Sequence, residues 1–368
     1  MKVSFIKSAI AQAVAATSPV VPAKPSIPTL RGILIAVTGD TATFSASDGQ
    51  SHIITTAGCE TDEDGTILIP GRLLANIVNQ LPEKVVTLDV SDQEVHVSCG
   101  RSTFKIPAMT VDDYPPLPET PDVAGDISGH TFTNAISAVK HSASSDDTLP
   151  MLTGVRIEAE GDTITLVTTD RFRLSTRKIG WGGENFTALV DAKGLSDAAK
   201  IVGSQPAKIL FDGHRFGVHV EGTTFITRII DADFPKWRAL VAKTSTSAAH
   251  VGRRALVDAV KRVTMVNPTD PRVMFNVEQG RITVGSIESD GGSASEIIDC
   301  DLDGEPISIS FNGKYVQDAV SGFDGDRVLL TMTDEKRPGT FWDDTSVDEG
   351  AVPDSGDLTL VMPVTIKG

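Results

Sequence analysis

Two groups of residues in this sequence have types and spacings that could support chemistry, and the first group is acidic. Asp299, Asp301 and Asp303 alternate ahead of Gly304, as the first ligands of a calcium-binding loop do. Such a loop closes on a bidentate acid, but Ser310 occupies that position and no helix is expected before the cluster. We interpret these residues as an acidic turn at a strand end, and we expect no metal and no other cofactor.

The second group is the loop Thr169-Asp170-Arg171-Phe172-Arg173-Leu174, which carries two arginines. A loop carboxylate such as Asp170 more commonly forms a salt bridge than acts as a catalytic acid. The sequence has no Gly-x-Ser-x-Gly motif, no Gly-Lys-Ser/Thr phosphate loop and no dinucleotide-binding glycine fingerprint. Its histidines lack i,i+4 spacing, and its three cysteines are too far apart for a zinc site. The residues therefore give no positive indication of an enzyme.

The arginine loop ends a predicted β-hairpin that the chain repeats. Apolar and polar side chains alternate over residues 154–160, Gly161-Asp162 marks the turn, and residues 163–169 form the return strand. An earlier copy lies 122 residues upstream, the spacing that separates Gly39 from Gly161. A more divergent third copy covers residues 273–286.

A second feature recurs at nearly the same spacing. Arg72, Lys193 and Lys314 each open a predicted helix, and 121 residues separate each of them from the next. Phe104 and Phe225 are also 121 residues apart. Three units of about 120 residues therefore fill the 368-residue chain. We place three domains at residues 1–123, 124–245 and 246–368, joined by linkers at residues 114–125 and 242–249.

Each unit is expected to contain two amphipathic helices and several short strands. The predicted helices cover residues 5–16, 70–81, 132–139, 193–202 and 256–263, with one more opening at Lys314. The predicted strands of the first unit cover residues 33–38, 41–46, 52–57, 85–90, 94–99 and 102–106. Acidic residues 341–357 are expected to form a loop, and residues 358–366 a closing strand. This pattern indicates an α+β fold, with helices on one face of antiparallel sheets.

The charge is unevenly distributed over these elements. The net charge is −16, but residues 1–39 carry four cations and no acid, and residues 251–263 carry four cations against one acid. Lysine and arginine are good exposed helix formers, which alone could explain them. A cation at a helix start opposes the helix dipole, however, and its threefold recurrence suggests that something anionic faces these helices. No apolar run approaches the ~18 residues of a membrane span, and we expect a cytoplasmic protein.

In its order of motifs the chain resembles the bacterial DNA polymerase III β subunit family, the sliding clamps. The matching elements are Met1-Lys2-Val3, Pro25-x-x-Pro28-x-Leu30-x-Gly32, Leu152-x-Gly154, Thr169-Asp170-x-x-Arg173-Leu174, Phe234-Pro235, Phe311-Asn312-x-x-Tyr315-Val316 and Val361-Met362-Pro363. The resemblance implies three clamp domains per chain and a head-to-tail homodimer that closes into a ring around duplex DNA. Helices would line the hole and sheets would lie outside, conferring processivity on the replicative polymerase in DNA replication without any bond chemistry.

The resemblance also implies partner peptides from the polymerase, the clamp loader and other proteins with a clamp-binding motif. Their groove lies between the second and third domains. The residues implied for it are Leu152, Thr169, Arg171, Phe172, Arg173, Leu174, Pro235, Leu240, Asn312, Tyr315, Leu360, Met362, Pro363, Val364 and Ile366. The residues implied for sequence-independent DNA binding are Lys24, Arg72, Lys193, Lys200, Arg253, Arg254 and Lys314. The residues implied for the dimer interface are Phe104, Ile106 and Met265.

The sequence departs from the family at points that affect peptide preference. Arg171-Phe172 replace the usual small residue followed by an aromatic residue or histidine, and Ala239 stands where a basic residue is frequent. Lys367-Gly368 extend past the usual end. Two other functions remain as alternatives: a metal-dependent hydrolase that uses residues 299–303, and a repetitive assembly protein that binds no DNA.

Overall fold

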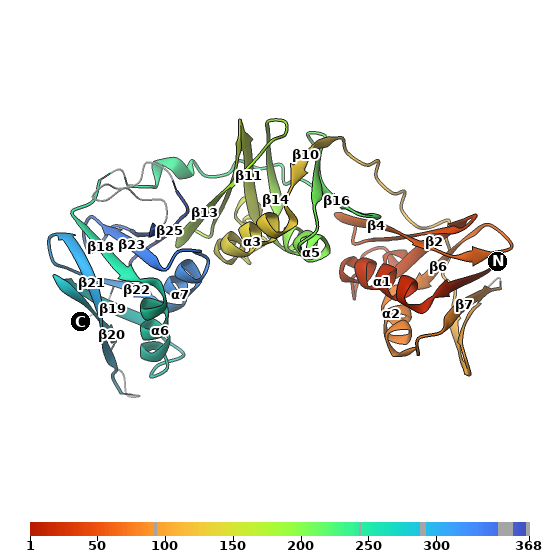
Figure 1. The fold of residues 1–368 in the computed structure, drawn as a ribbon, viewed down its shortest axis with the longest axis horizontal. Helices are drawn as coiled ribbons and strands as arrows, with labels where there is room; N and C mark the ends of the chain where they lie inside the picture. The colour runs from red at the N-terminus through yellow and green to blue at the C-terminus, as the bar shows by residue number, and fades with distance from the viewer. Residues whose placement is uncertain (92–93, 243, 288–291, 345–355, 366–368) are drawn as a thin grey trace. The chain divides into compact units, whose positions relative to one another are not determined.

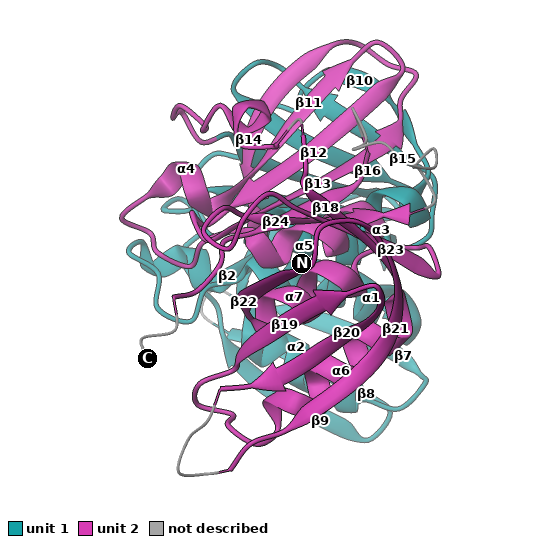
Figure 2. Ribbon diagram, turned by 90° about the vertical axis from the view of Figure 1, so that its left-hand side faces the viewer, with its two compact units in different colours: residues 1–133, 193–229 teal, residues 134–192, 230–368 magenta. Residues whose placement is uncertain are grey.

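The computed structural model describes residues 1–368 except 92–93, 243, 288–291, 345–355 and 366–368 (Figure 1). The chain forms two compact units. Unit 1 comprises residues 1–133 and 193–229, and unit 2 comprises residues 134–192 and 230–368 (Figure 2). Within the described residues, no helix is long and apolar enough to cross a membrane.

Unit 1 contains two antiparallel sheets. The first has five strands in the order β5-β1-β7-β8-β9. Its strands are β1 (Lys2–Ile6), β5 (Glu60–Thr61), β7 (Val85–Val90), β8 (Glu94–Cys99) and β9 (Ser102–Pro107). The second has eight strands in the order β10-β15-β16-β17-β4-β3-β2-β6. Its strands are β2 (Gly32–Thr38), β3 (Thr41–Ser47), β4 (Ser51–Gly58), β6 (Gly65–Pro70), β10 (Val123–Ile127), β15 (Ala207–Phe211), β16 (Arg215–Val220) and β17 (Thr223–Arg228).

Helices α1 (Lys7–Thr17) and α2 (Gly71–Gln80) contact each other in unit 1. Ile10 and Val14 of α1 and Leu74 and Val78 of α2 are buried, the i,i+4 spacing of an amphipathic helix. The prediction that α1 begins near residue 5 is wrong, because Lys2–Ile6 is strand β1, paired with β7. Within β1 Val3 and Phe5 are buried and Ile6 is exposed, a two-residue period that belongs to a strand.

Unit 2 is built on one antiparallel sheet of twelve strands, in the order β14-β11-β12-β13-β25-β24-β23-β18-β21-β20-β19-β22. Helices α6 (Arg253–Thr264) and α7 (Gly313–Ser321) contact each other beside it. The strands are β11 (Gly154–Glu160), β12 (Thr163–Thr169), β13 (Arg173–Gly180), β14 (Phe186–Asp191), β18 (Ser247–Gly252), β19 (Arg272–Glu278), β20 (Gly280–Ser286), β21 (Ser295–Gly304), β22 (Ile307–Asn312), β23 (Arg327–Met332), β24 (Gly339–Asp343) and β25 (Leu358–Val361). The other helices of the chain are α3 (Gly129–Val139), the single turn α4 (Pro150–Thr153) and α5 (Ala192–Val202).

The predicted threefold repeat is visible in the strand pairings. Hairpins β2–β3, β11–β12 and β19–β20 each turn at a glycine with positive φ: 58° at Gly39, 60° at Gly161 and 84° at Gly280. A later segment of each repeat then hydrogen-bonds to the strand that precedes the second helix. These amide-to-carbonyl distances are 2.9 Å from Met109 to Leu68, 2.7 Å from Ile230 to Leu189 and 2.8 Å from Val364 to Ser310. The α+β fold and its three repeats are therefore confirmed.

The end of the chain differs from the prediction. The loop expected at residues 341–357 is wrong at its start, since β24 continues to Asp343 and buries Phe341 and Trp342. Most of its remainder, residues 345–355, lies outside the described residues. The closing strand ends at Val361 rather than residue 366, because Pro363 lacks the amide hydrogen that a strand ladder needs.

Candidate protein-interaction site

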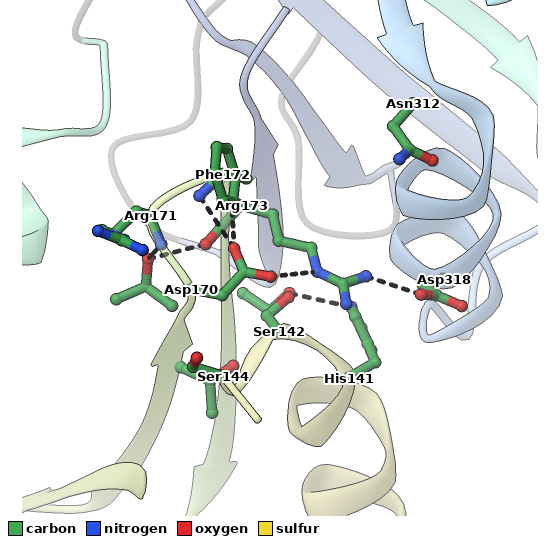
Figure 3. Close-up of polar contacts among 12 residues, drawn as sticks. His141, Ser142, Ser144, Asp170, Arg171, Phe172, Arg173, Asn312 and Asp318 are labelled. Carbon is green, nitrogen blue, oxygen red and sulfur yellow. Dashed lines mark hydrogen bonds and ion pairs between the residues drawn. The ribbon is translucent and has the colours of Figure 1, made fainter. Parts of the chain in front are cut away.

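The arginine loop joins β12 to β13 in unit 2 and is fixed by its own side chains (Figure 3). The Asp170 carboxylate accepts hydrogen bonds from the amides of Phe172, at 2.9 Å, and Arg173, at 3.0 Å. The Thr169 hydroxyl donates to the Arg173 carbonyl at 2.8 Å. Arg171 has a φ of 80°, the one positive value outside glycine among the described residues. A side chain with Cβ is strained in that conformation.

Arg173 ties this loop to helix α7. Its Nε donates to Asp170 at 3.1 Å and its Nη1 to Asp318 at 2.7 Å. Its guanidinium lies 4.2 Å from the centre of the Tyr315 ring, a cation–π contact. The Arg173 side chain is only 10% exposed. We call these four residues the Arg173 clasp; Asp318 reaches the loop because it lies one helical turn after Tyr315.

His141 lies beneath the clasp. Its Nε2 is 3.2 Å from the Ser175 hydroxyl, which is 2.7 Å from Ser142 and 2.9 Å from Thr359. Burial, and then the nearby Arg173 cation, lower the pKa of His141 to about 4. The imidazole is therefore neutral at neutral pH and adds no positive charge to that of Arg173.

An apolar cluster supports the loop from the other side. Leu174 pairs with Leu360 across strands β13 and β25, and both are buried in a cluster with Trp237. The other buried members of the cluster are Val167, Leu329, Trp342 and Leu358, with Phe234, Val241 and Ala248 packed against it. Segment 234–241, which carries Pro235 and Leu240, is thereby fixed over the sheet. Strands β13 and β25 bring the arginine loop and the chain terminus together.

Exposed apolar side chains surround this cluster. The exposed fractions are 54% for Phe172, 38% for Met362 and 52% for Leu240. The Met362 amide donates to the Phe172 carbonyl at 2.8 Å, so the loop and the chain terminus present their side chains together. Exposed apolar groups that are gathered on a rigid base are typical of a protein-binding surface.

The structure brings only some of the predicted peptide-binding residues together. It brings together residues 169–174, Tyr315, Leu360 and Met362 through the contacts above. Leu152 is buried and Asn312 caps α7 through the Lys314 amide, so each has a structural role. Pro363 and Val364 line a separate pocket of about 350 Å³ with Ser310 and Lys336. Ile366 lies outside the described residues.

Sequence reasoning missed three residues that shape this site: Asp318, His141 and Trp237. Asp318 had a detectable signal, because it lies three residues after Tyr315 on a predicted helix. Trp237 is one of only three tryptophans and lies two residues after the Phe234-Pro235 motif, which was a detectable signal. His141 carries no signal in the sequence, since burial by distant strands determines its role.

The predicted DNA-binding cations lie where the helices begin. Arg72, Lys193 and Lys314 are each the second residue of α2, α5 and α7, and all three are exposed. Lys24 and Arg254 are also exposed. Three of the seven are engaged in the chain. Lys200 pairs with Asp197 at 2.8 Å, the half-buried Arg253 donates to the Gly325 carbonyl at 2.6 Å, and Arg72 donates to the Val21 carbonyl at 3.3 Å.

The predicted dimer residues also differ in exposure. Phe104, on the edge strand β9, is 37% exposed, and Met265, just after α6, is 69% exposed. Ile106 is 1% exposed and packs inside its own unit, so its side chain is not available to a partner in this chain alone. The acidic residues Asp299, Asp301 and Asp303 lie on the exposed face of β21 rather than in a loop. Within the described residues, no three metal-ligating side chains gather to form a metal site.

The whole chain is similar to proteins of one family. The family models of the DNA polymerase III beta subunit match in order: the N-terminal domain at residues 1–118, the central domain at 126–236 and the C-terminal domain at 238–349. The beta sliding clamp of Streptomyces coelicolor is 35% identical, with 100% of each chain covered. The beta sliding clamp homolog GriR of Streptomyces muensis is 32% identical, with 93% of each chain covered.

Solved structures agree in fold. The DNA polymerase sliding clamp of Bacillus subtilis superposes with a TM-score of 0.93 at 23% identity, covering 100% of both chains. A DnaN sliding clamp from Pseudomonas aeruginosa, solved bound to griselimycin, gives a TM-score of 0.90 at 19% identity, again over 100% of both chains. At these identities the solved structures support the fold alone.

Proposed function

This chain belongs to the DNA polymerase III beta subunit family, the beta sliding clamps, and from that premise we propose how its own residues serve the clamp. The protein is a sliding clamp, a processivity factor of DNA replication and not an enzyme. We propose domain boundaries at residues 1–123, 124–245 and 246–368, and a cytoplasmic location beside the chromosome. The two earlier alternatives, a hydrolase and an assembly protein, are set aside by family membership.

The ring is proposed to close through strand pairing between two copies. In unit 1, β17 pairs with β4, and in unit 2, β25 pairs with β13. Strands β17 and β25 occupy the same position in successive repeats, and so do β4 and β13. The strands at these two positions that remain are β9 and β21, so the third pairing in the series would join β9 to β21. Both have room, since β9 is an edge strand and β21 pairs over Ser295–Asp299 only with β20. A head-to-tail homodimer supplies both such pairings at once.

The repeat also gives the register of that pairing. Phe225 pairs with Ile53. The counterpart of Phe225 in the first repeat is Phe104, and the counterpart of Ile53 in the third repeat is Ala294. Phe104 would therefore lie opposite Ala294 of the partner subunit. Phe225 is 0% exposed while its counterpart Phe104 is 37% exposed. The difference is what a missing neighbour strand would cause, and it is the observation that carries the dimer proposal.

Helix contacts support the same geometry. In unit 2, a Cβ on Gly322 after α7 would lie 3.2 Å from the Ala138 backbone of α3, so these two helices meet closely. At the proposed dimer junction, the counterpart of α7 is α2 and the counterpart of α3 is the partner subunit's α6. Leu73 on α2 is 42% exposed and Met265 after α6 is 69% exposed, and the proposed dimer would bury both.

Duplex DNA is the proposed ligand of the helix-start cations. Arg72, Lys193 and Lys314 recur once per repeat, so a dimer would present six such positions toward phosphates, joined by Lys24, Lys200, Arg253 and Arg254. Contacts to phosphate do not depend on sequence and weaken with salt. Weak, interchangeable contacts permit sliding, while ring closure prevents release. The acidic remainder of the chain would repel DNA elsewhere.

Partner peptides are proposed to bind over the Arg173 clasp and the apolar cluster. The peptide would come from the polymerase, the clamp loader or another clamp-binding protein, and griselimycin is proposed to compete for the same surface. Phe172, Leu240 and Met362 offer exposed apolar contacts, while Thr169, Arg173, Leu174 and Leu360 hold the surface rigid. Burying one or two apolar anchors at ~1.5–3 kcal/mol each, less ordering costs, gives roughly micromolar affinity.

Loading onto circular DNA tests the clamp proposal. Native mass spectrometry is expected to show a dimer, and nicked circular plasmid is expected to retain the protein at high salt until the plasmid is linearised. Phe104→Glu is expected to give monomers that are not retained. Ile27→Glu is the matched control, an exposed apolar residue of unit 1 that is not part of β9. A monomeric wild-type protein, or equal retention on linear and circular DNA, would refute the ring.

Peptide binding is tested separately. Met362→Ala with Leu240→Ala removes two exposed contacts and is expected to reduce peptide affinity at least tenfold without affecting the dimer. Met362→Ala with Leu174→Ala is expected to abolish binding, although Leu174 is buried and its variant needs a folding control. Unchanged affinity in both double variants would disprove the assignment of this surface.

A further inference from the structure

Segment 234–239 and strand β11 enclose a pocket of about 390 Å³ in unit 2. Phe234, Pro235 and Trp237 form its apolar part. Trp237 also packs in the cluster that holds Leu174 and Leu360. The pocket therefore adjoins the surface proposed to bind partner peptides, because Phe234 and Trp237 belong to both.

The polar part of the pocket is cationic. Arg156, Lys236 and Arg238 line it together with one acid, Glu158, which is 7% exposed. The Glu158 carboxylate is 2.8 Å from Arg238 Nη2 and 3.3 Å from Arg156 Nε, and Trp237 Nε1 donates to it at 3.5 Å. Three cations against one acid leave the lining with an excess of two positive charges, in a chain whose net charge is −16.

Arg238 is held ready for a second anion. Its guanidinium lies 4.4 Å from the centre of the Trp237 ring, so stacking fixes its plane, and its side chain is still 59% exposed. A guanidinium has five N–H donors. The contact of Arg238 with Glu158 is an ion pair in which Glu158 Oε2 accepts no hydrogen bond. Lys236 is exposed and forms no ion pair with any residue in the described ranges. These donors are positioned on a rigid base and face solvent.

We propose that this pocket binds acidic residues that flank the apolar anchors of a partner peptide. The inference rests on the proposed function, since it assumes that the anchors occupy the adjoining surface. A peptide carboxylate would accept hydrogen bonds from Arg238 and Lys236, and two such groups would neutralise the excess charge. The shared Phe234 and Trp237 favour a peptide over a nucleic acid, because apolar side chains beside cations suit a chain that carries both apolar and acidic side chains.

Fluorescein-labelled synthetic peptides test this pocket. All carry the same uncharged core, in which one serine separates two large apolar residues. The core is flanked, at either end, by Asp-Asp-Gly or by the neutral Asn-Asn-Gly. Fluorescence anisotropy is expected to show that one acidic-flank peptide binds roughly five- to tenfold more tightly than its neutral counterpart. The preference is expected to fall below about twofold in 0.5 M salt, where charges are screened. The oligonucleotide dT10 is expected not to compete.

Single variants test whether Arg238 and Lys236 cause the preference for acidic flanks. Arg238→Gln and, separately, Lys236→Gln are expected to reduce the preference to about twofold or less while leaving the neutral-flank affinity unchanged. Lys236→Gln breaks no ion pair in the described structure, so it covers the case in which Arg238→Gln folds poorly. Arg281→Gln is the matched control, an arginine of unit 2 that is 56% exposed and paired with Glu278, and it is expected to keep the full preference.

The outcomes separate the two proposals. If neutral and acidic peptides bind equally well, the acidic pocket is refuted and the peptide surface stands. If no peptide binds, the proposed peptide surface fails and the pocket fails with it. A preference that persists in both pocket variants, or competition by dT10, also overturns the inference.

Discussion

The Arg173 clasp is predicted to contribute a measurable share of the stability of unit 2. Replacing Arg173 by methionine keeps the unbranched apolar stem of the side chain but removes the charge shared by Asp170 and Asp318, at 3.1 and 2.7 Å. The three side chains are 10%, 13% and 29% exposed, so solvent screens the clasp only in part. Charge-assisted hydrogen bonds of this kind contribute about 1.5–3 kcal/mol each. Asp170 keeps two amide donors, so we expect a total loss of about 2–4 kcal/mol.

A double-mutant cycle isolates the link to α7. Asp318→Asn leaves the Arg173 bond to Asp170 intact and is expected to cost about 1 kcal/mol. The double variant is expected to be more stable than the sum of the single effects predicts, by about 1–2 kcal/mol, because Arg173 and Asp318 act on one another. The cycle for Arg281 and Glu278, which are 56% and 51% exposed, serves as control and is expected to give less than about 0.5 kcal/mol.

Urea unfolding followed by tryptophan fluorescence measures these values. Trp181, Trp237 and Trp342 are the only tryptophans and all belong to unit 2, so the signal reports that unit alone. The slope of stability against urea should not change between variants, since a changed slope would signal a loss of two-state behaviour. Additivity of the Arg173 and Asp318 effects within about 0.5 kcal/mol would refute the view that Arg173 joins the loop to α7.

Three further changes follow from the same region. Arg171→Gly relieves the φ of 80° and is expected to raise the stability of unit 2 by about 0.5–1 kcal/mol, net of the greater freedom of glycine when unfolded; a lower urea midpoint would contradict this. His141 has a pKa of about 4 when folded and about 6.5 when unfolded, so the unfolded chain binds more protons between these values. Stability from this group is therefore present above pH 6.5 and is lost, by up to roughly 3 kcal/mol, as the pH falls to 4; His141→Gln should reduce that slope. Asn312→Ala removes the cap of α7, whose oxygen accepts from the Lys314 amide at 3.0 Å, and should cost about 1 kcal/mol by urea unfolding.

Much of the fold could be predicted because the local patterns and the repeat agree. Gly39 and Gly161 mark hairpin turns whose positive φ favours glycine, and the spacing between them located the strands to within a residue or two. The β1 strand was missed because Val3 and Phe5 alternate over too few residues to compete with the helical pattern that follows. Pairing with β7, more than eighty residues away, decides it.

The site was only partly predictable, for a related reason. Thr169 to Leu174 form a contiguous motif, and the chain itself ensures that these residues lie together. Asp318 and His141 come from distant segments and meet Arg173 only after β13 and β25 pair. The resemblance supplied Tyr315 and Met362 but not Trp237, whose role depends on how segment 234–241 folds over the sheet.

The three repeats are joined by the same kind of strand pairing, but the side chains beside each pairing differ. At the junction inside unit 2, Arg173 and Asp318 form an ionic contact, with the Tyr315 ring and the neutral His141 beside it. The counterparts at the proposed dimer junction are Met265, Gly292, Leu73 and Asn76, which carry no charge. An ionic clasp needs fixed geometry and is suited to a junction that never opens. An apolar junction reseals without precise alignment of charges. The junction between β17 and β4 in unit 1 also lacks the clasp, but the chain itself bridges it. A ring that must open to admit DNA is therefore expected to open at the junction between subunits, which has neither the clasp nor a covalent link.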